Sequence, residues 1–163
     1  MRKFIICFML SVFAVSAFSQ DGVTSKTFGG FWDFSFGESK TSVLNKLKNY
    51  SKDIGEIDDD GEKVYLFDLV YNGIDFDTAL LTFRDGKLLF GYFVAKPKDQ
   101  DEAFKMLSGI TYPLKEEYGI PEIETDGGVY HKWKDAVGSR IWVSIKGNKG
   151  ETMITLSYYS SDM

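Results

Sequence analysis

Few residues of this 163-residue chain have side chains suited to catalysis or metal binding. The chain has one histidine, His131, and one cysteine, Cys7. A lone histidine can act as a general base, but it has no second histidine with which to share a transition metal. His131 lies between Tyr130 and Lys132 in a segment with the pattern of a strand. We therefore expect a surface or sheet-packing role for it rather than catalysis.

An acidic loop offers carboxylate ligands for calcium. Aligning its glycine with the invariant glycine of a calcium-binding loop places Glu56, Asp58 and Asp60 at ligand positions one, three and five. Position twelve requires a bidentate glutamate, and here it falls on Phe67. The sequence therefore favours a solvated acidic loop, with weak calcium binding as the alternative.

Asp75 and Asp77 are a second carboxylate pair, two residues apart on a predicted strand. The carboxylate pair of a glycoside hydrolase needs a defined separation across a cleft and one raised pKa. Two neighbours on one face of a strand are more typical of a solvated surface. The chain also lacks a nucleophile elbow, a phosphate loop and a dinucleotide fingerprint. We expect no catalytic residue, cofactor or metal, and a carboxylate-dependent hydrolase remains an alternative.

Basic and aromatic residues concentrate at the C-terminal end of the chain. Residues 129–163 hold five basic and three acidic residues, whereas residues 20–128 hold 12 and 21. Over residues 140–146 aliphatic side chains alternate with polar and aromatic ones, which places the two sets on opposite faces of a strand. Tyrosine, tryptophan and arginine often anchor protein interfaces. The candidate binding residues are Trp142, Arg140, Lys146, Tyr159, Tyr130 and Lys132.

This pattern predicts a non-enzymatic binding protein that holds a protein or peptide partner against an open sheet face. The prediction depends on strand register, because a shift of one residue would turn Trp142 to the opposite face. A sheet buried on both faces is the alternative.

The first 19 residues have the pattern of a secretory signal peptide. Arg2 and Lys3 precede an uncharged apolar run over residues 4–18, and Ala17 and Ser19 provide small residues for cleavage. The run is shorter than the roughly 20 residues that a membrane-spanning helix needs. We expect cleavage near Ser19 and export to the periplasm or the medium, with no transmembrane segment in the mature chain. An uncleaved N-terminal anchor is the alternative.

Composition and length indicate one globular domain over residues 28–163, preceded by a flexible mature N-terminus at residues 20–27. Hydrophobic residues make up 44% of the chain, and 16% of the residues are aromatic, so a sizeable core can form. With one cysteine, the chain can form no internal disulfide. The net charge of -5 argues against general nucleic-acid binding.

Two helices are predicted from capping residues and apolar spacing. Ser39 is a good N-cap for a helix over about residues 39–50, and Asp99 is a good N-cap for a second helix that ends at Gly119. Pro113 should kink or split the second helix.

Seven segments have the composition of strands, and Asn72-Gly73 and Asp85-Gly86 are typical two-residue hairpin turns. The predicted strands cover residues 28–36, 64–71, 74–83, 87–95, 129–134, 140–146 and 152–159. The fold class is therefore α+β, with an antiparallel sheet of six to seven strands and both helices on one face. The order β-α-β-β-β-α-β-β-β is compatible with a duplicated α-β-β-β unit.

Short motifs point to a known type of protein. They are a Phe-Gly-x-Ser helix start at residues 36–39, a Tyr-Gly-x-Pro helix stop at residues 118–121, a strand with Trp133 and an aromatic last strand at residues 154–159. With them the chain resembles small exported bacterial α+β proteins of unknown function over residues 28–159. Its layout is also similar to the SmpA/OmlA outer-membrane assembly lipoproteins and to the β-lactamase-inhibitor-protein-like fold.

The resemblance implies an α+β fold and carries over no catalytic residue. It adds one alternative function, inhibition of a secreted or periplasmic hydrolase. The chain departs from SmpA/OmlA proteins because it lacks their lipidated cysteine, so a role in outer-membrane assembly is not implied.

Overall fold

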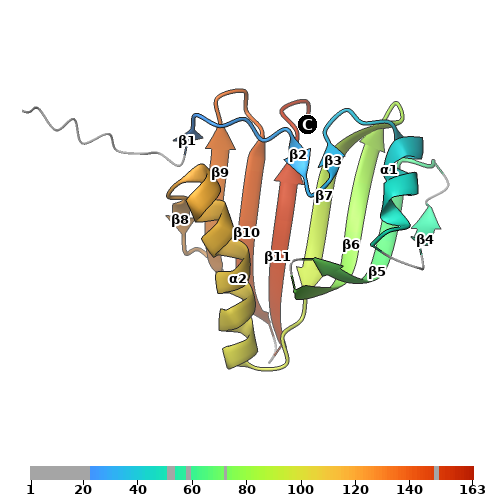
Figure 1. Cartoon of the computed structure of the whole chain (residues 1–163). Helices are drawn as coiled ribbons and strands as arrows, with labels where there is room; N and C mark the ends of the chain where they lie inside the picture. Colours follow the sequence, from blue (N-terminus) through green and yellow to red (C-terminus); the bar gives the residue numbers. More distant parts are fainter. Residues whose placement is uncertain (1–22, 51–53, 58–59, 72, 149–150) are drawn as a thin grey trace, which may run out of the picture.

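The computed structural model of the protein describes residues 23–50, 54–57, 60–71, 73–148 and 151–163. The predicted signal peptide lies outside these residues, as does Asp58 of the predicted acidic loop. Figure 1 shows the described part as a broad sheet with two helices against it.

Helix α1 spans Lys40–Leu47 and helix α2 spans Gln100–Tyr118. The strands are β1 (Val23–Thr24), β2 (Gly30–Phe31), β3 (Phe34–Ser35), β4 (Ile54–Ile57), β5 (Lys63–Tyr71), β6 (Ile74–Arg84), β7 (Lys87–Ala95), β8 (Glu122–Glu124), β9 (Val129–Asp135), β10 (Arg140–Asn148) and β11 (Glu151–Tyr159).

Nine of these strands form one sheet in the order β1-β9-β10-β11-β7-β6-β5-β4, with β8 paired to β9. The pair β1–β9 is parallel, and the other pairs are antiparallel. The predicted α+β class and the mainly antiparallel sheet are confirmed. The predicted count of six to seven strands is wrong. The additional strands β1, β4 and β8 have two to four residues each, which is too short for a clear alternation of apolar side chains.

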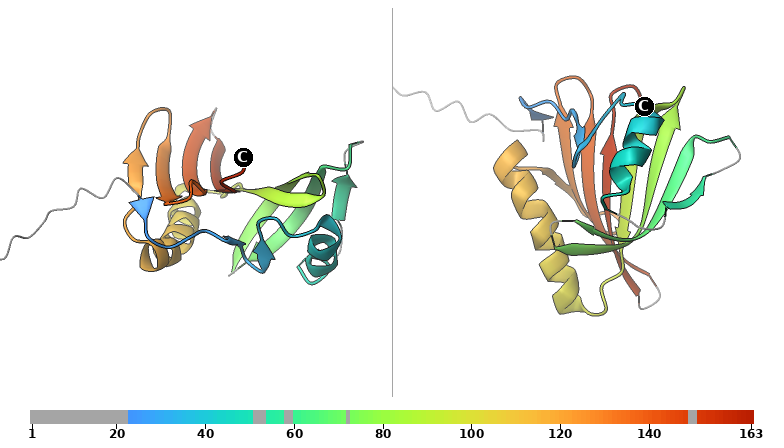
Figure 2. Two further views of the ribbon diagram at one scale, coloured as in Figure 1. Left: turned by 90° about the horizontal axis from the view of Figure 1, so that it is seen from above. Right: turned by 45° about the vertical axis from the view of Figure 1, so that its right-hand side comes forward.

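Two three-stranded meanders make up most of the sheet. The meander β5-β6-β7 follows α1, the meander β9-β10-β11 follows α2, and the two join where β7 pairs with β11. Figure 2 shows both helices on the same face of the twisted sheet, with α2 against the second meander and α1 against the first. No described helix covers the opposite face. Four strands follow each helix, β4 to β7 after α1 and β8 to β11 after α2, so the predicted order and its α-β-β-β unit are wrong, and the duplication itself stays a prediction.

Local signals determine the helix ends. The side chains of Ser39 and Asp99 each accept a hydrogen bond from the amide three residues further on, as predicted for N-caps. Helix α2 continues without a break through Pro113, so the predicted split is wrong. Ile110 and Leu114 are buried on both sides of the proline, and their packing against the sheet keeps the helix continuous.

The two-residue turn at Asp85-Gly86 has the predicted conformation, whereas the N-terminal segment contains a reversal that was not predicted. Asp85 and Gly86 have φ values of 51° and 69°, as their two-residue turn requires. The single strand predicted over residues 28–36 is wrong, because the chain reverses at Trp32 and β2 pairs with β3 in a separate two-stranded sheet. Trp32 has a φ of 51°, which is rare for a bulky side chain.

Aromatic burial explains the path of this segment. The ring of Phe31 is stacked with that of Tyr158 at a centroid distance of 5.2 Å, and it lies 5.4 Å from the ring of Phe93. Gly91 makes room for Phe31, because a Cβ atom there would lie 2.5 Å from the ring. The aromatic residues of the segment therefore enter the core instead of extending the sheet.

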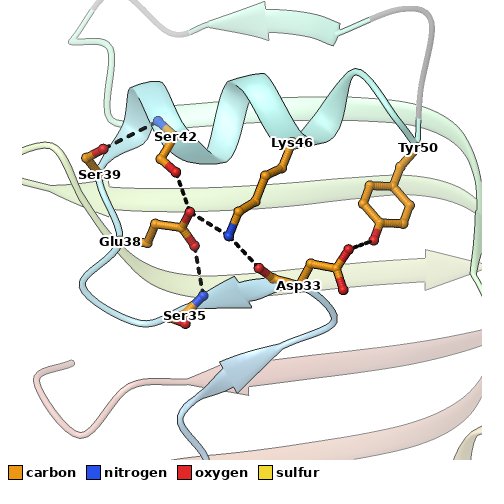
Figure 3. Close-up of polar contacts among 7 residues, drawn as sticks. All are labelled: Asp33, Ser35, Glu38, Ser39, Ser42, Lys46 and Tyr50. Atoms are coloured by element: carbon orange, nitrogen blue, oxygen red, sulfur yellow. Dashed lines mark hydrogen bonds and ion pairs between the residues drawn. The ribbon is translucent and has the colours of Figure 1, made fainter.

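A polar network around Glu38 links the hairpin to α1 (Figure 3). The carboxylate accepts hydrogen bonds from the Ser42 hydroxyl at 2.5 Å and from the Ser35 amide at 3.0 Å, and it forms an ion pair with Lys46 at 2.7 Å. Partial burial acts to raise the pKa of Glu38, but these contacts outweigh it and lower the pKa from 4.5 to about 2.

The same network fastens the turn that contains Trp32. Lys46 donates a hydrogen bond to the backbone carbonyl of Asp33 at 2.7 Å, and the Tyr50 hydroxyl donates to the Asp33 carboxylate. The bond to this carboxylate is the main reason that the pKa of Tyr50 rises to about 12. The turn is thus held on α1 by a cation and a phenol.

We expect Glu38→Gln to lower the free energy of unfolding at pH 7 by about 1–3 kcal/mol, the usual loss for hydrogen bonds to a charged group. The folded-state pKa of Glu38 is lowered, so its contribution is fully present above the unfolded-state value of 4.5 and is lost as the pH falls towards 2. The difference between wild type and variant should therefore shrink over this interval. Urea unfolding at a series of pH values measures it.

Glu116→Gln is the matched control, because the side chain of Glu116 is exposed on α2. It should change the free energy of unfolding by less than about 0.5 kcal/mol. A loss for Glu38→Gln that stayed constant from pH 7 to pH 2 would contradict the assigned role of the carboxylate.

Candidate functional site

The face of the sheet opposite the helices is the candidate site, and strand register decides which residues lie on it. Trp142 is paired with Ser157 on one side and with Lys132 on the other, and directly paired residues point to the same face. Ile141 and Val143 alternate with Trp142 and are fully buried on the helix side. The structure thereby brings all six predicted residues to the open face, each of them half-buried: Trp142, Arg140, Lys146, Tyr159, Tyr130 and Lys132.

Cations and aromatic rings contact one another along one end of this face. The guanidinium of Arg140 lies 5.0 Å from the ring centre of Tyr159 and 5.6 Å from that of Trp142. The rings of Trp142 and Tyr159 are 5.0 Å apart, and the Lys132 ammonium lies 5.3 Å from the Trp142 ring. Cation–π contacts of this kind restrain long side chains before any partner arrives, which lowers the entropy cost of binding.

Two lysines complete the charged part of the face. The ammonium of Lys146 lies 5.0 Å from the Tyr130 ring, and a hydrogen bond with the Tyr130 side chain raises the pKa of Lys146. Lys132 forms an ion pair with Glu124 of the edge strand β8, and this contact raises the pKa of Lys132. Both lysines are therefore cations at neutral pH.

A hollow of about 210 Å³ lies among these side chains. Its buried floor consists of the small hydroxyl residues Ser144, Thr155 and Ser157, and the first two share a hydrogen bond of 2.7 Å. The larger residues that surround it are Tyr92, Tyr130, Trp142, Lys146, Met153 and Tyr159. The hollow has the size and lining to receive one side chain of a partner.

Tyr92 and Met153 were not predicted as site residues. Tyr92 comes from the first meander and reaches this face because it is paired with Ser157 across the β7–β11 junction. The alternation of Phe90, Tyr92 and Val94 along β7 is visible in the sequence, but it does not reveal which strand lies beside β7.

Arg140 has a polar atom that lacks a partner. Its Nε is buried and has no hydrogen-bond acceptor among the described residues. A buried donor without an acceptor costs free energy.

His131 lies away from this face. It is 8% exposed on the helix side of β9, with its ring 6.4 Å from that of Trp133. Burial, followed by the charge of Lys115, lowers the pKa of His131. This position agrees with the sheet-packing role expected from the sequence.

The acidic candidates are also separate from the face. Asp75 and Asp77 are exposed on β6 and line a hollow of about 260 Å³, where the Asp77 carboxylate accepts a hydrogen bond from the Lys96 amide at 2.6 Å. Of the predicted calcium ligands, Asp60 is exposed, whereas Asp58 and the side chain of Glu56 lie outside the described residues. Calcium binding and carboxylate catalysis stay predictions.

The described part of the chain contains no group of three or more histidine, cysteine, aspartate or glutamate side chains placed to hold a metal ion. Neither of its helices combines the length and apolar character needed to cross a membrane.

Comparisons with models of protein families, with curated proteins and with solved structures find no match to this chain. The resemblance to exported α+β proteins therefore stays a prediction, and function has to be argued from the geometry of the open face.

The two tryptophans of β9 and β10 should respond differently to the same substitution. Trp133 is 1% exposed and donates a hydrogen bond from Nε1 to the Gly119 carbonyl at 2.8 Å, so Trp133→Ala should lower the free energy of unfolding by about 3–5 kcal/mol. Trp142 is half-buried on the open face, so Trp142→Ala should cost about 1 kcal/mol or less. Urea unfolding of both variants measures the contrast, and equal losses would place Trp142 in the core.

Proposed function

We propose that this protein is exported and binds an acidic protein or peptide segment in the cell envelope, without catalysing a reaction. The observation that carries the proposal is the group of half-buried aromatic and cationic side chains restrained on a sheet face that no described helix covers. The position near the cell envelope rests on the signal-peptide pattern alone.

Charge complementarity favours an acidic partner. The chain has a net charge of -5, yet Lys132, Lys134, Arg140 and Lys146 share the open face by strand register. Among the described residues, Lys132 forms an ion pair with Glu124 of the edge strand. A cationic face on an acidic protein attracts negatively charged partners and repels basic ones.

The arrangement also supplies anchors for a partner. Interface energy is usually concentrated in a few tryptophan, tyrosine and arginine residues beside a pocket. Here Trp142 and Tyr159 border the hollow, and the guanidinium of Arg140 lies beside their rings, where a carboxylate is a well-suited partner. Inhibition of a secreted hydrolase would be a special case in which the partner is an enzyme.

A pair of synthetic peptides tests the proposal. Both alternate leucine and phenylalanine with a charged residue, which is glutamate in one peptide and lysine in the other. Isothermal titration calorimetry should show binding of the glutamate peptide only, with an affinity that falls as salt is added. Trp142→Ala should weaken this binding at least tenfold, as expected for an anchor residue.

Charge reversals provide the matched controls. Arg140→Glu should abolish binding of the glutamate peptide, whereas Lys105→Glu makes the same change of sign on the exposed surface of α2 and should alter the affinity less than twofold. If the wild type binds neither peptide or both alike, or if Lys105→Glu is as harmful as Arg140→Glu, the face does not bind acidic segments.

Envelope extracts then identify the natural partner. A protein that is retained by the wild type and by Lys105→Glu, but lost with Trp142→Ala, would be the candidate. Circular dichroism of each variant establishes that the sheet is intact.

A further inference from the structure

A cavity of about 410 Å³ lies on the helix side of the sheet, away from the proposed partner face. Residues of α2, of the β2–β3 hairpin and of strands β5, β6 and β11 line it, and Figure 1 shows the hairpin between the two helices on this side. Aromatic side chains form much of its wall: Phe31, Trp32, Phe34, Tyr71, Phe76 and Tyr158. The volume lies within the range of roughly 300–1,000 Å³ that is usual for small-molecule sites.

Helix α2 contributes to the wall two residues of types that are unfavourable within a helix. Gly109 and Pro113 lie four residues apart, and both line the cavity. A Cβ atom at Gly109 would meet only the side chain of Ile74, at 3.4 Å, so packing alone does not require glycine. Because proline has no N–H, the carbonyl of Gly109 lacks its usual donor within the helix. Gly109 lines the cavity, so a hydrogen-bond donor on a ligand is a suitable partner for this carbonyl.

Trp32 lines the cavity on the side of the hairpin. Its φ of 51° is unfavourable for a bulky residue. The contacts of Asp33 with Lys46 and Tyr50 hold the turn in this conformation (Figure 3). A strained residue that its surroundings hold in place is often found at a ligand site.

The charged residues around the cavity limit the class of ligand that it can bind. Glu117 is the one charged residue among the described residues that line the cavity. Burial, together with the charge of Glu117 and a hydrogen bond to it, raises the pKa of Tyr118 to about 12, and burial also raises the pKa of Tyr158. Both phenols are therefore neutral at physiological pH, and an anion would meet only the negative charge of Glu117.

We propose that this cavity binds a small planar aromatic molecule that has a hydrogen-bond donor and no negative charge, such as an indole or an aromatic amine. The ring would pack among the aromatic walls. A positive charge on the ligand would gain from Glu117 and from the faces of the rings. This site is on the other side of the sheet from the proposed partner face, so either proposal can fail without the other.

Three probes that share an indole ring test the ligand class by isothermal titration calorimetry: indole, tryptamine and indole-3-acetate. Tryptamine should bind at least as tightly as indole, and indole-3-acetate should bind at least tenfold more weakly. If none of the three binds at millimolar concentration, or if indole-3-acetate binds most tightly, the proposal is wrong.

Variants of α2 test the location. Gly109→Leu should fill the cavity and weaken tryptamine binding at least tenfold without lowering Tm, because leucine favours a helix more than glycine does. Ser108→Leu is the matched control, since Ser108 is exposed on the same helix and does not line the cavity. Equal affinities for the two variants would place binding elsewhere.

Two further variants test the contacts of the ligand. Trp32→Ala removes one aromatic wall of the cavity, so it should weaken binding of all probes that bind. Glu117→Gln should remove any preference for tryptamine over indole. If both variants bind the probes as the wild type does, the proposed recognition is wrong.

Discussion

Strands β7 and β11 are paired over residues 90–95 and 154–159, and this pairing joins two meanders that are each formed by local hairpins. Across the junction Tyr92 is paired with Ser157 on the open face, while Phe93 is paired with Leu156 in the core. A shift of one residue would exchange these positions and bury the tyrosine. The open face and the core therefore depend on the same register.

The sheet is wider than its two helices can cover, which explains why other side chains fill part of the helix side. Each helix packs against one meander, which leaves the region between them to other side chains. The N-terminal segment fills part of it with Phe28, Phe31 and Phe34, all buried. Its hairpin cannot follow the sheet, because its rings pack inward instead of alternating, and the network around Glu38 and Asp33 holds it on α1. The cavity is the space that this segment and α2 leave unfilled.

Features set by neighbouring residues could be predicted from the sequence, and features set by distant contacts could not. The caps at Ser39 and Asp99 and the turn at Asp85-Gly86 depend on a few adjacent residues. Alternation along β10 separated Trp142 from the aliphatic residues, but strand register was needed to decide which set faces the helices. The neighbour of β7 depends on contacts between the two halves, so Tyr92 was missed. The reversal at Trp32 was missed because its positive φ is maintained by contacts with α1 rather than by a turn-forming residue.

Strand β11 shows how one short element can contribute to two different surfaces. Leu156 and Tyr158 line the cavity, whereas Ser157 and Tyr159 line the hollow of the open face. β11 is central in the sheet, so its backbone is paired on both sides and its side chains alone determine the character of each surface. On the helix side the tyrosine is enclosed and its hydroxyl stays neutral, which suits an uncharged or cationic ring. On the open side the tyrosine is half-buried beside Arg140, which suits a carboxylate. The alternation that usually separates core from solvent here separates two surfaces of different chemistry.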